Sequence, residues 1–365
     1  MNISAWSTRT ADSVIRRHPV LWETWGYEWG VVLKGIEQVW RKTGTPRYFD
    51  YIKANVDHFV LPNGSIKTYQ VEEYNLDQIN TGKLLFLLYE KTGEEKYKAA
   101  IHLLRKQLAD QPRTSEGGFW HKKIYPHQMW LDGIYMAGPF YTQFARMFGE
   151  PQAFDDATQQ ILLIAEHTRD PQTGLFYHGW DESKTQRWAN LKTGCSPNFW
   201  SRAMGWFGMA LVDVLDDLPQ AHPNRSKIIT LLETMIAALA PVQDKTTGLW
   251  YQVLDQGNRK GNYLEASGSC MFVYTFAKGV RKGYLSAHRL DMVTRAYQGI
   301  LDNMVEVDAQ GLVNLHRICS VGGLGGNPYR DGSFEYYISE KIVTNDYKGV
   351  GAFILASVEM EASCK

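Results

Sequence analysis

Two kinds of apolar pattern alternate along the chain. In the first, apolar residues recur every three or four positions between charged residues, as in segments 48–60 and 97–108. This spacing predicts amphipathic helices with one solvated face. In the second, apolar and small residues occupy almost every position, as in 82–89, 205–212 and 349–356. A helix that is apolar on all sides is buried on all sides. The alternation therefore predicts an inner ring of helices wrapped by an outer ring.

The connections on the two rims of these rings differ in length. Short turns at Gly44, Gly93 and Gly149 follow the expected inner helices, and glycine is a common left-handed helix cap. Longer segments, each with a turn and a predicted aromatic strand, precede the inner helices at 115–121 and 172–178. Because long loops on one rim usually carry function, we expect the active rim where the inner helices begin.

These patterns predict an all-α fold, an (α/α)6 six-hairpin barrel with inner and outer helix rings and long loops on the active rim. We expect a single domain over residues 1–365. Polar and aromatic residues stand where the inner helices begin, for example at 25–27, 75–77, 129–132 and 200–202. If the inner helices pack side by side, these residues converge on one pocket.

Composition excludes several classes of function. Lys plus Arg and Asp plus Glu number 39 each, so no net field favours nucleic acid or an anionic membrane. No apolar stretch reaches the roughly 18 residues of a membrane span, and residues 1–6 lack the pattern of a secretory signal. We therefore expect a cytoplasmic protein that binds neither nucleic acid nor membranes. A monomer or a weak homo-oligomer is expected, and no sequence motif encodes this state.

Two residue types bear on the ligand. The 12 Trp and 20 Tyr residues offer flat apolar faces with a polar edge, which match sugar rings; the alternative is that they only fill a wide core. The four cysteines lie far apart and have no histidine at metal-ligand spacing. We expect a carbohydrate ligand and no metal.

Asp132 and Asp77 are the candidate acid–base groups. Asp132 follows Trp130 at the start of a buried helix, and burial raises the pKa of a carboxyl group, whereas the helix N-terminus lowers it. Asp77 occupies the same place in the preceding repeat, and paired carboxylates are the usual equipment for cleaving glycosidic bonds. The alternative is that each aspartate only caps its helix.

His178, Arg202 and Trp206 are candidate ligand-binding residues. An arginine fork matches a carboxylate, and Trp206 lies one helical turn after Arg202, where it could stack on the attached ring. The combination favours an acidic sugar. The alternatives are a histidine that is merely hydrogen-bonded and an arginine–tryptophan cation–π pair.

The segment 321–333 is rich in glycine but does not follow a strand and open a helix, as a phosphate-binding loop does. We expect a flexible flap over the pocket, and the alternative is a plain surface loop.

Five motifs at these positions are long enough to be specific. They are Glu-Gly-Gly-Phe-Trp-His-Lys at 116–122, Met-Trp-Leu-Asp-Gly at 129–133, Gly-Leu-Phe-Tyr-His-Gly-Trp-Asp at 174–181, Thr-Gly-Cys-Ser-Pro-Asn-Phe-Trp-Ser-Arg-Ala-Met-Gly-Trp at 193–206 and Leu-Glu-Ala-Ser-Gly-Ser at 264–269. Over nearly the whole chain, the sequence resembles the unsaturated rhamnogalacturonyl hydrolases of glycoside hydrolase family 105. That resemblance implies the same six-hairpin barrel.

The resemblance also implies roles for individual residues. Asp132 would be the general acid and base, and Asp77 an assisting carboxylate. The residues implied to contact the substrate are Gly26, Tyr27, His121, Lys122, Tyr125, His178, Arg202, Trp206 and Gly322. The implied substrate is a small oligosaccharide that ends in a 4,5-unsaturated galacturonyl residue on rhamnose. The implied reaction hydrates the C4=C5 bond so that the glycosidic bond breaks, and it needs neither a metal nor an organic cofactor.

Three alternatives remain open at this point. One is an unsaturated glucuronyl hydrolase. Another is a sugar epimerase or isomerase on an (α/α)6 barrel, which normally uses histidines as acid and base, and His121, His127 and His178 lie in the expected rim loops. The last is a glycan-binding protein without catalysis.

Overall fold

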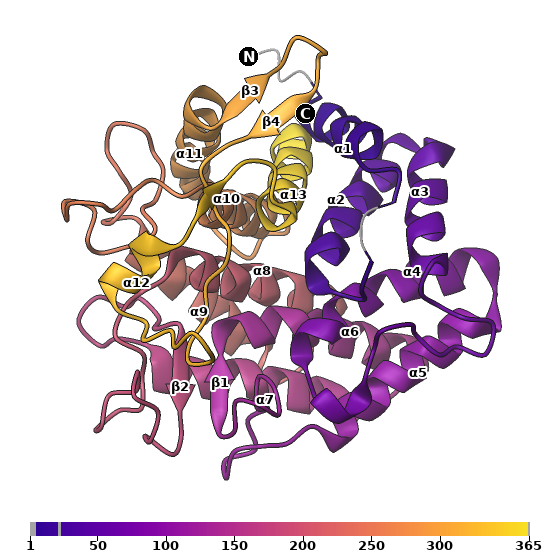
Figure 1. The fold of residues 1–365 in the computed structure, drawn as a ribbon, viewed down its shortest axis with the longest axis horizontal. Coiled ribbons are helices and arrows are strands. Elements are labelled where there is room, and N and C mark those ends of the chain that lie inside the picture. The colour runs from indigo at the N-terminus through magenta and orange to yellow at the C-terminus, as the bar shows by residue number, and fades with distance from the viewer. Residues whose placement is uncertain (1–4, 21–22, 364–365) are drawn as a thin grey trace.

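The apolar helices form a closed inner ring in the structure, a computed structural model that describes residues 5–20 and 23–363. Each inner helix packs on the next, and the last packs on the first (Figure 1). Within the described residues these helices are α2 (Tyr27–Thr43), α4 (Lys83–Thr92), α6 (Leu131–Phe148), α8 (Ser201–Asp217), α10 (Ala266–Arg281) and α13 (Tyr347–Ser363). The predicted (α/α)6 barrel is confirmed.

The amphipathic helices form the outer layer. They are α1 (Trp6–Arg17), α3 (Pro46–Asp57), α5 (Glu95–Asp110), α7 (Pro151–Thr168), α9 (Arg225–Leu239) and α11 (Leu290–Asn303). In α5 the predicted stripe is buried, and it consists of Tyr97, Ile101, Leu104 and Leu108. The charged residues between its members are partly or fully exposed. The burial of this stripe against the inner ring is what orders the helix.

Short turns end the inner helices as expected. Gly44, Gly93 and Gly149 cap α2, α4 and α6 with φ of +66°, +68° and +68°. Side chains other than glycine rarely adopt this left-handed conformation. These glycines lie on the rim that faces away from the long loops.

The aromatic segments on the other rim are turns with single bridges rather than the predicted strands. Phe119 bridges Arg113, and Phe176 bridges Arg169. The short strands of the described residues form three antiparallel pairs: β1 (Gln128–Trp130) with β2 (Gly179–Asp181), β3 (Val305–Val307) with β4 (Val313–Leu315), and β5 (Ile318–Cys319) with β6 (Ile342–Val343). Short helical turns complete the loops: η1 (Val71–Glu73), η2 (Leu76–Gly82), η3 (Ala287–Arg289) and α12 (Phe334–Ser339).

The β1–β2 pair links two successive inner helices at the loop rim. Trp130 pairs with Gly179, and the Leu131 amide donates to the His178 carbonyl at 3.0 Å. The start of α6 is thereby held against the segment that leads toward α8. Every described helix is too short or too polar to cross a lipid bilayer.

Candidate active site

Asp132 lies in the first turn of α6, where Trp130 is the N-cap residue and provides no side-chain cap. Its side chain makes no capping hydrogen bond; instead its Oδ2 lies 3.1 Å from Nε2 of His178. The two atoms are close enough for an ion pair, but they are not aligned as a hydrogen bond, and neither atom forms another hydrogen bond within the described residues. Asp132 is 9% exposed. The alternative that Asp132 only caps its helix is therefore wrong.

His178 lies directly behind Asp132 and is fully buried. Its Nδ1 lies 2.8 Å from the Tyr337 hydroxyl, so the imidazole connects Asp132 to Tyr337. Trp200 stacks on Tyr337 and packs against the imidazole, with ring centroids 5.7 and 4.8 Å apart. The side chain of His178 is enclosed on all sides and lies behind Asp132, and its contact with a substrate stays a prediction.

Asp77 lies in a different electrostatic environment. Its Oδ2 is 2.6 Å from Nζ of Lys122, and its Oδ1 is 3.4 Å from Nε2 of His121. Burial alone would raise the pKa of Asp77, but the Lys122 ammonium outweighs it, and the pKa is lowered. Burial likewise opposes the charge of Lys122, yet Asp77 raises the pKa of that amine. The pair is ionised at neutral pH.

Asp77 begins no α-helix, contrary to expectation. It lies in the 3₁₀ helix η2, and the amide N–H of Asp77 donates to the Asn75 side chain at 3.0 Å. Polar residues of η2 bind the start of α2: Thr81 donates to the Gly26 carbonyl at 2.6 Å, and Asn80 donates to the Tyr27 carbonyl at 3.1 Å. These bonds hold Gly26 and Tyr27 next to Asp77.

Trp130 connects the surroundings of the two aspartates. One face of its ring stacks on His121 at 4.5 Å, Tyr125 stacks on the ring at 4.8 Å, and the ring edge meets His178 at 5.4 Å. Burial lowers the pKa of His121 to about 4, although Asp77 opposes the shift. His121 is thus neutral at pH 7, and it is 2% exposed. Its ring lies against Asp77 and Trp130, and its contact with a substrate stays a prediction.

Tyr27 is buried near several charged side chains, including both aspartates. Burial raises the pKa of its hydroxyl, and the charges of Glu28, Asp77 and Asp132 raise it further. The structure therefore brings both aspartates to the same rim as Tyr27.

Trp206 forms the floor beneath Tyr27. Its ring meets Tyr27 edge-on at 6.3 Å and stacks on Tyr135 at 5.0 Å, and only 1% of the residue is exposed. Tyr135 occupies one face of the indole, so Trp206 supports the site from inside the barrel. Stacking of Trp206 on a sugar stays a prediction.

Arg202 is buried with part of its guanidinium engaged. Its Nη1 donates to the Cys319 carbonyl and to the Ser267 hydroxyl, the latter at 3.4 Å. The group also lies 5.0 Å from the Trp200 ring centroid, which is the cation–π alternative. Its Nε and Nη2 form no hydrogen bond with the described residues, so one edge of the fork is left for a ligand.

The 321–333 loop is anchored rather than free as a flexible flap. Arg330 donates to the Tyr125 hydroxyl at 2.8 Å, and the backbones of Gly325 and Arg330 pair across the loop. Leu324 is fully buried in a cluster with Trp130. Gly322 lies against Trp200, where a Cβ atom would come within 2.4 Å of the indole. The loop is part of the wall of the site.

An open groove adjoins this loop. It has a volume of about 960 Å³ and is lined by Ile124, Tyr125, Gln128, Gln186, Val321, Gly326, Asn327, Pro328, Tyr329, Arg330, Tyr336, Ser339 and Glu340. Tyr125 belongs both to the groove wall and to the stack on Trp130. The groove therefore lies beside the aromatic stack on Trp130, two residues before Asp132 in the chain.

Three residues of the site were not anticipated from the sequence. Tyr337 and Arg330 act across 159 and 205 residues of chain, and no local pattern indicates such contacts. Trp200 was noted only as part of a motif, although it packs on His178, Tyr337 and Arg202. Within residues 5–20 and 23–363, no three His, Cys, Asp or Glu side chains gather in a way that would hold a metal ion.

The chain is similar to several known proteins. The model of Glycosyl Hydrolase Family 88 matches residues 6–364. Protein Atu3128 of Agrobacterium fabrum is 40% identical over 233 residues, which cover 61% of this chain and 97% of that protein. The unsaturated rhamnogalacturonyl hydrolase YesR of Bacillus subtilis is 26% identical over 307 residues, 82% of each chain. A solved structure of a glycoside hydrolase from family 105 of C. acetobutylicum superposes with a TM-score of 0.96 at 49% identity, covering 98% of this chain and 99% of the other.

Proposed function

The chain belongs to glycosyl hydrolase family 88 and is a glycoside hydrolase, and on this premise we propose that it removes the 4,5-unsaturated uronic acid from the non-reducing end of rhamnogalacturonan oligosaccharides. The name of the B. subtilis relative supports the rhamnogalacturonyl substrate. Hydration of the C4=C5 bond is the proposed route to cleavage.

One observation carries this proposal: the two carboxyl groups of the rim differ in their partners. Asp77 has the Lys122 ammonium at 2.6 Å and stays an anion. Asp132 has no lysine or arginine at ion-pair distance within the described residues, and its contact is the imidazole of His178. Environments that separate two carboxyl groups in this way assign one as proton carrier and the other as a fixed charge. Asp132 is therefore the proposed general acid.

The reaction follows from this assignment. Asp132 delivers a proton to C4 of the enol ether, and positive charge develops at C5 and the ring oxygen. The carboxylate that remains then takes a proton from a water that attacks C5, so Asp132 regains its proton and a hemiketal forms at C5. The hemiketal opens and the aglycone leaves with its oxygen. The charge of Asp77 would favour the cationic transition state.

His178 can support both halves of this cycle as a positioning residue. Its Nε2 faces Asp132 while its Nδ1 is held by Tyr337 at 2.8 Å, so the ring cannot turn away. A neutral imidazole can either donate to the carboxylate or accept from the carboxylic acid, depending on its tautomer. The geometry thus accommodates both protonation states of Asp132.

The free edge of Arg202 suits the carboxylate of the uronic acid, and the Tyr125–Arg330 wall of the groove suits the leaving sugar. The epimerase alternative is disfavoured, because other side chains engage both imidazoles. His178 lies between Asp132 and Tyr337, and His121 lies against Asp77 and Trp130.

The proposal is tested with Asp132→Asn on a rhamnogalacturonan-lyase digest. Loss of the ultraviolet absorbance of the conjugated uronate follows the reaction. We expect kcat to fall by about 10²–10⁴ or more, the usual contribution of a general acid–base group, while the circular dichroism spectrum and substrate binding are kept. Wild-type protein that leaves this absorbance unchanged on unsaturated rhamnogalacturonan, galacturonan and glucuronyl disaccharides would refute the proposal.

A further inference from the structure

A second cavity lies at the end of the barrel opposite the candidate active site. It has a volume of about 250 Å³ and is lined by residues from the C-terminal halves of α2, α8 and α10, with Lys83 and Glu359 among them. In α8, Arg202 begins the helix and Asp213 is eleven residues further on, about 16 Å along the axis. Tyr135 stacks on Trp206, the floor of the active site. The two sites are therefore separate.

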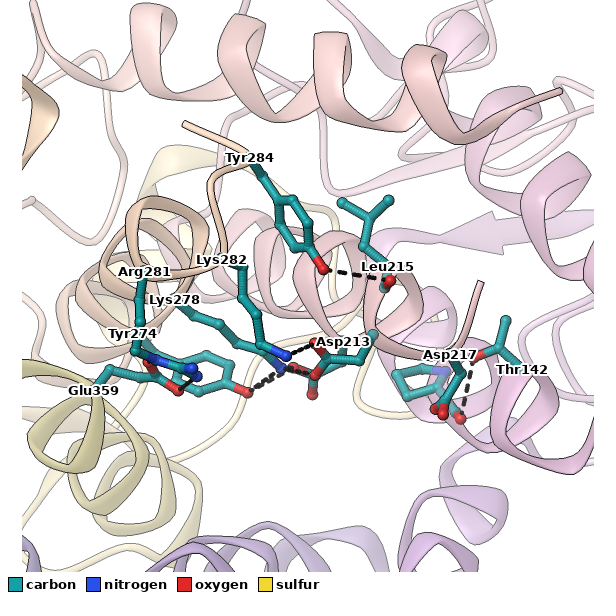
Figure 2. A network of polar contacts seen from close by, with 12 residues as sticks. Thr142, Asp213, Leu215, Asp217, Tyr274, Lys278, Arg281, Lys282, Tyr284 and Glu359 are labelled. Carbon is teal, nitrogen blue, oxygen red and sulfur yellow. Dashed lines mark hydrogen bonds and ion pairs between the residues drawn. The ribbon is translucent and has the colours of Figure 1, made fainter. Parts of the chain in front are cut away.

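The charges that line this cavity are paired, with one exception. Six basic and five acidic side chains line it, and each carboxylate has a basic partner. Figure 2 shows the central part, in which Lys278 and Lys282 lie beside Asp213 and Arg281 pairs with Glu359. The ion pairs are Glu37 with Lys34 and Arg41, Asp213 with Lys278, Asp216 with Lys278 and Lys282, Asp217 with Arg146, and Glu359 with Arg281.

Lys83 is the exception. It is 2% exposed, and its Nζ has no hydrogen bond or ion pair with any described residue. The amine lies 3.6 Å from the ring centroid of Tyr135, whose own hydroxyl is also buried without a hydrogen bond. Lys83 belongs to the cavity lining, whereas Tyr135 does not. A buried polar group without a partner costs about 1–3 kcal/mol, so the Lys83 amine in this lining indicates a ligand that satisfies it.

We propose that this cavity binds a small organic monocarboxylate, with its carboxylate on Lys83 and its polar remainder near Gln143, which also lines the cavity. Lys83 is the one basic side chain of this lining without a carboxylate partner among the described residues, which matches a single negative charge. A cavity of about 250 Å³ exceeds the room that one ion or water needs, roughly 10–15 Å³ by the same measure. A carboxylate with up to several further carbon and oxygen atoms fits.

The protonation of Lys83 gives this site a distinctive signature. Burial lowers its pKa well below the usual value; Lys34 and Lys278 lower it further, while Asp213 and Glu37 oppose them. An anion beside the amine favours its charged form. Binding at a pH where the free amine is neutral must therefore take up a proton.

The test uses gluconate, with sorbitol as the uncharged molecule of the same chain length. Calorimetric titrations of the wild-type enzyme at pH 9, in two buffers with different ionisation enthalpies, report both affinity and proton uptake. We expect gluconate to bind with uptake of about one proton, and sorbitol not to bind. Lys83→Met should weaken gluconate binding at least about tenfold and abolish the proton uptake, because methionine keeps the packing on Tyr135 but removes the amine.

Two further variants keep the outcome decisive. Gln143→Glu places a carboxylate in the cavity wall and should weaken gluconate binding even if Lys83→Met fails to fold. Lys122→Met alters only the active rim and should leave gluconate binding unchanged. Absence of binding to the wild type, binding that survives Lys83→Met with the same proton uptake, or binding that is lost in Lys122→Met would each overturn the proposal.

Discussion

At the scale of single residues, the site depends on buried side chains that hold the two aspartates in place. Asp132 is backed by His178, which is fixed by Tyr337, and Asp77 is fixed by Lys122. Some of these residues would contact the substrate, and the others would position those residues. Substitutions in the two groups should therefore change kcat and KM to different extents.

Tyr337→Phe removes the hydroxyl at 2.8 Å from Nδ1 of His178 and leaves the ring in place. We expect kcat to fall about tenfold with KM little changed, because the lost hydrogen bond is worth about 1–1.5 kcal/mol and Tyr337 is fully buried. Tyr336→Phe is the matched control: the Tyr336 hydroxyl accepts from the Gly323 amide and lines the groove, so KM should change more than kcat. A change of KM alone in Tyr337→Phe would contradict the positioning role of His178.

Lys122→Met removes the charge that keeps Asp77 ionised. With the ammonium gone, burial raises the pKa of Asp77, so the acid limb of the pH–rate profile should move to higher pH. We expect kcat/KM to fall more at pH 5 than at pH 8. Lys123→Met, at the adjacent exposed residue, should leave the profile unchanged.

The same pair has a consequence for acid stability. Because the pKa of Asp77 is lowered in the folded state, its contribution to the free energy of unfolding is present above the unfolded-state pKa of about 3.9 and is lost as pH falls through the folded-state value. The free energy of unfolding, measured by chemical denaturation, should therefore differ less between the wild type and Lys122→Met at pH 2 than at pH 6. An equal difference at both pH values would show that Lys122 stabilises the fold without its charge.

At the scale of elements, the 321–333 loop acts as a wall because it packs on the aromatic residues around His178. Gly322→Ala would place a Cβ atom 2.4 Å from Trp200, and Trp200 packs against His178 at 4.8 Å. We expect a loss of about 1–3 kcal/mol in the free energy of unfolding from overpacking, together with a lower kcat. Chemical denaturation and absorbance kinetics measure the two effects, and a variant with unchanged stability and activity would show that the loop moves aside freely.

The elements also show what the sequence could predict. The end of a helix can be predicted from local sequence, as at Gly93, because glycine adopts the left-handed cap conformation without help from distant residues. The 3₁₀ helix at Asp77 does not follow, because it depends on hydrogen bonds from Asn80 and Thr81 to the start of α2. The anchoring of Arg330 on Tyr125 spans 205 residues and has no local signal. The pattern of burial thus predicts the barrel, whereas the supports of the site are set by long-range contacts.

At the scale of the whole molecule, the barrel is closed by its two ends. The yellow α13 lies beside the indigo α2 (Figure 1), and Ser7 of α1 donates to Glu361 of α13 through both its amide and its hydroxyl, at 2.9 and 2.6 Å. Glu361 also pairs with Lys42 in the last turn of α2, so this contact lies at the end of α2 opposite Tyr27. At that end, residues from both ends of the chain close the ring.

Two glycines permit this closure. A Cβ atom at Gly351 would lie 2.7 Å from the backbone of Val31 and 2.8 Å from the amide nitrogen of Val32, and one at Gly35 would lie 3.0 Å from Ile354. Backbone atoms cannot turn aside as a side chain can, so a methyl group at Gly351 must push α13 away from α2.

Gly351→Ala should therefore lower the free energy of unfolding by about 1–3 kcal/mol, although alanine is the better helix former by about 1 kcal/mol. Gly138→Ala in α6 is the comparison variant, because its Cβ atom would meet only the Val214 side chain, at 3.3 Å. It should lose less stability than Gly351→Ala, even though Pro139 follows it. Because α2 carries Tyr27 to the rim, the same displacement should raise KM in Gly351→Ala and not in Gly138→Ala. Equal stabilities of the two variants in chemical denaturation would mean that the ring closes without close contact between α2 and α13.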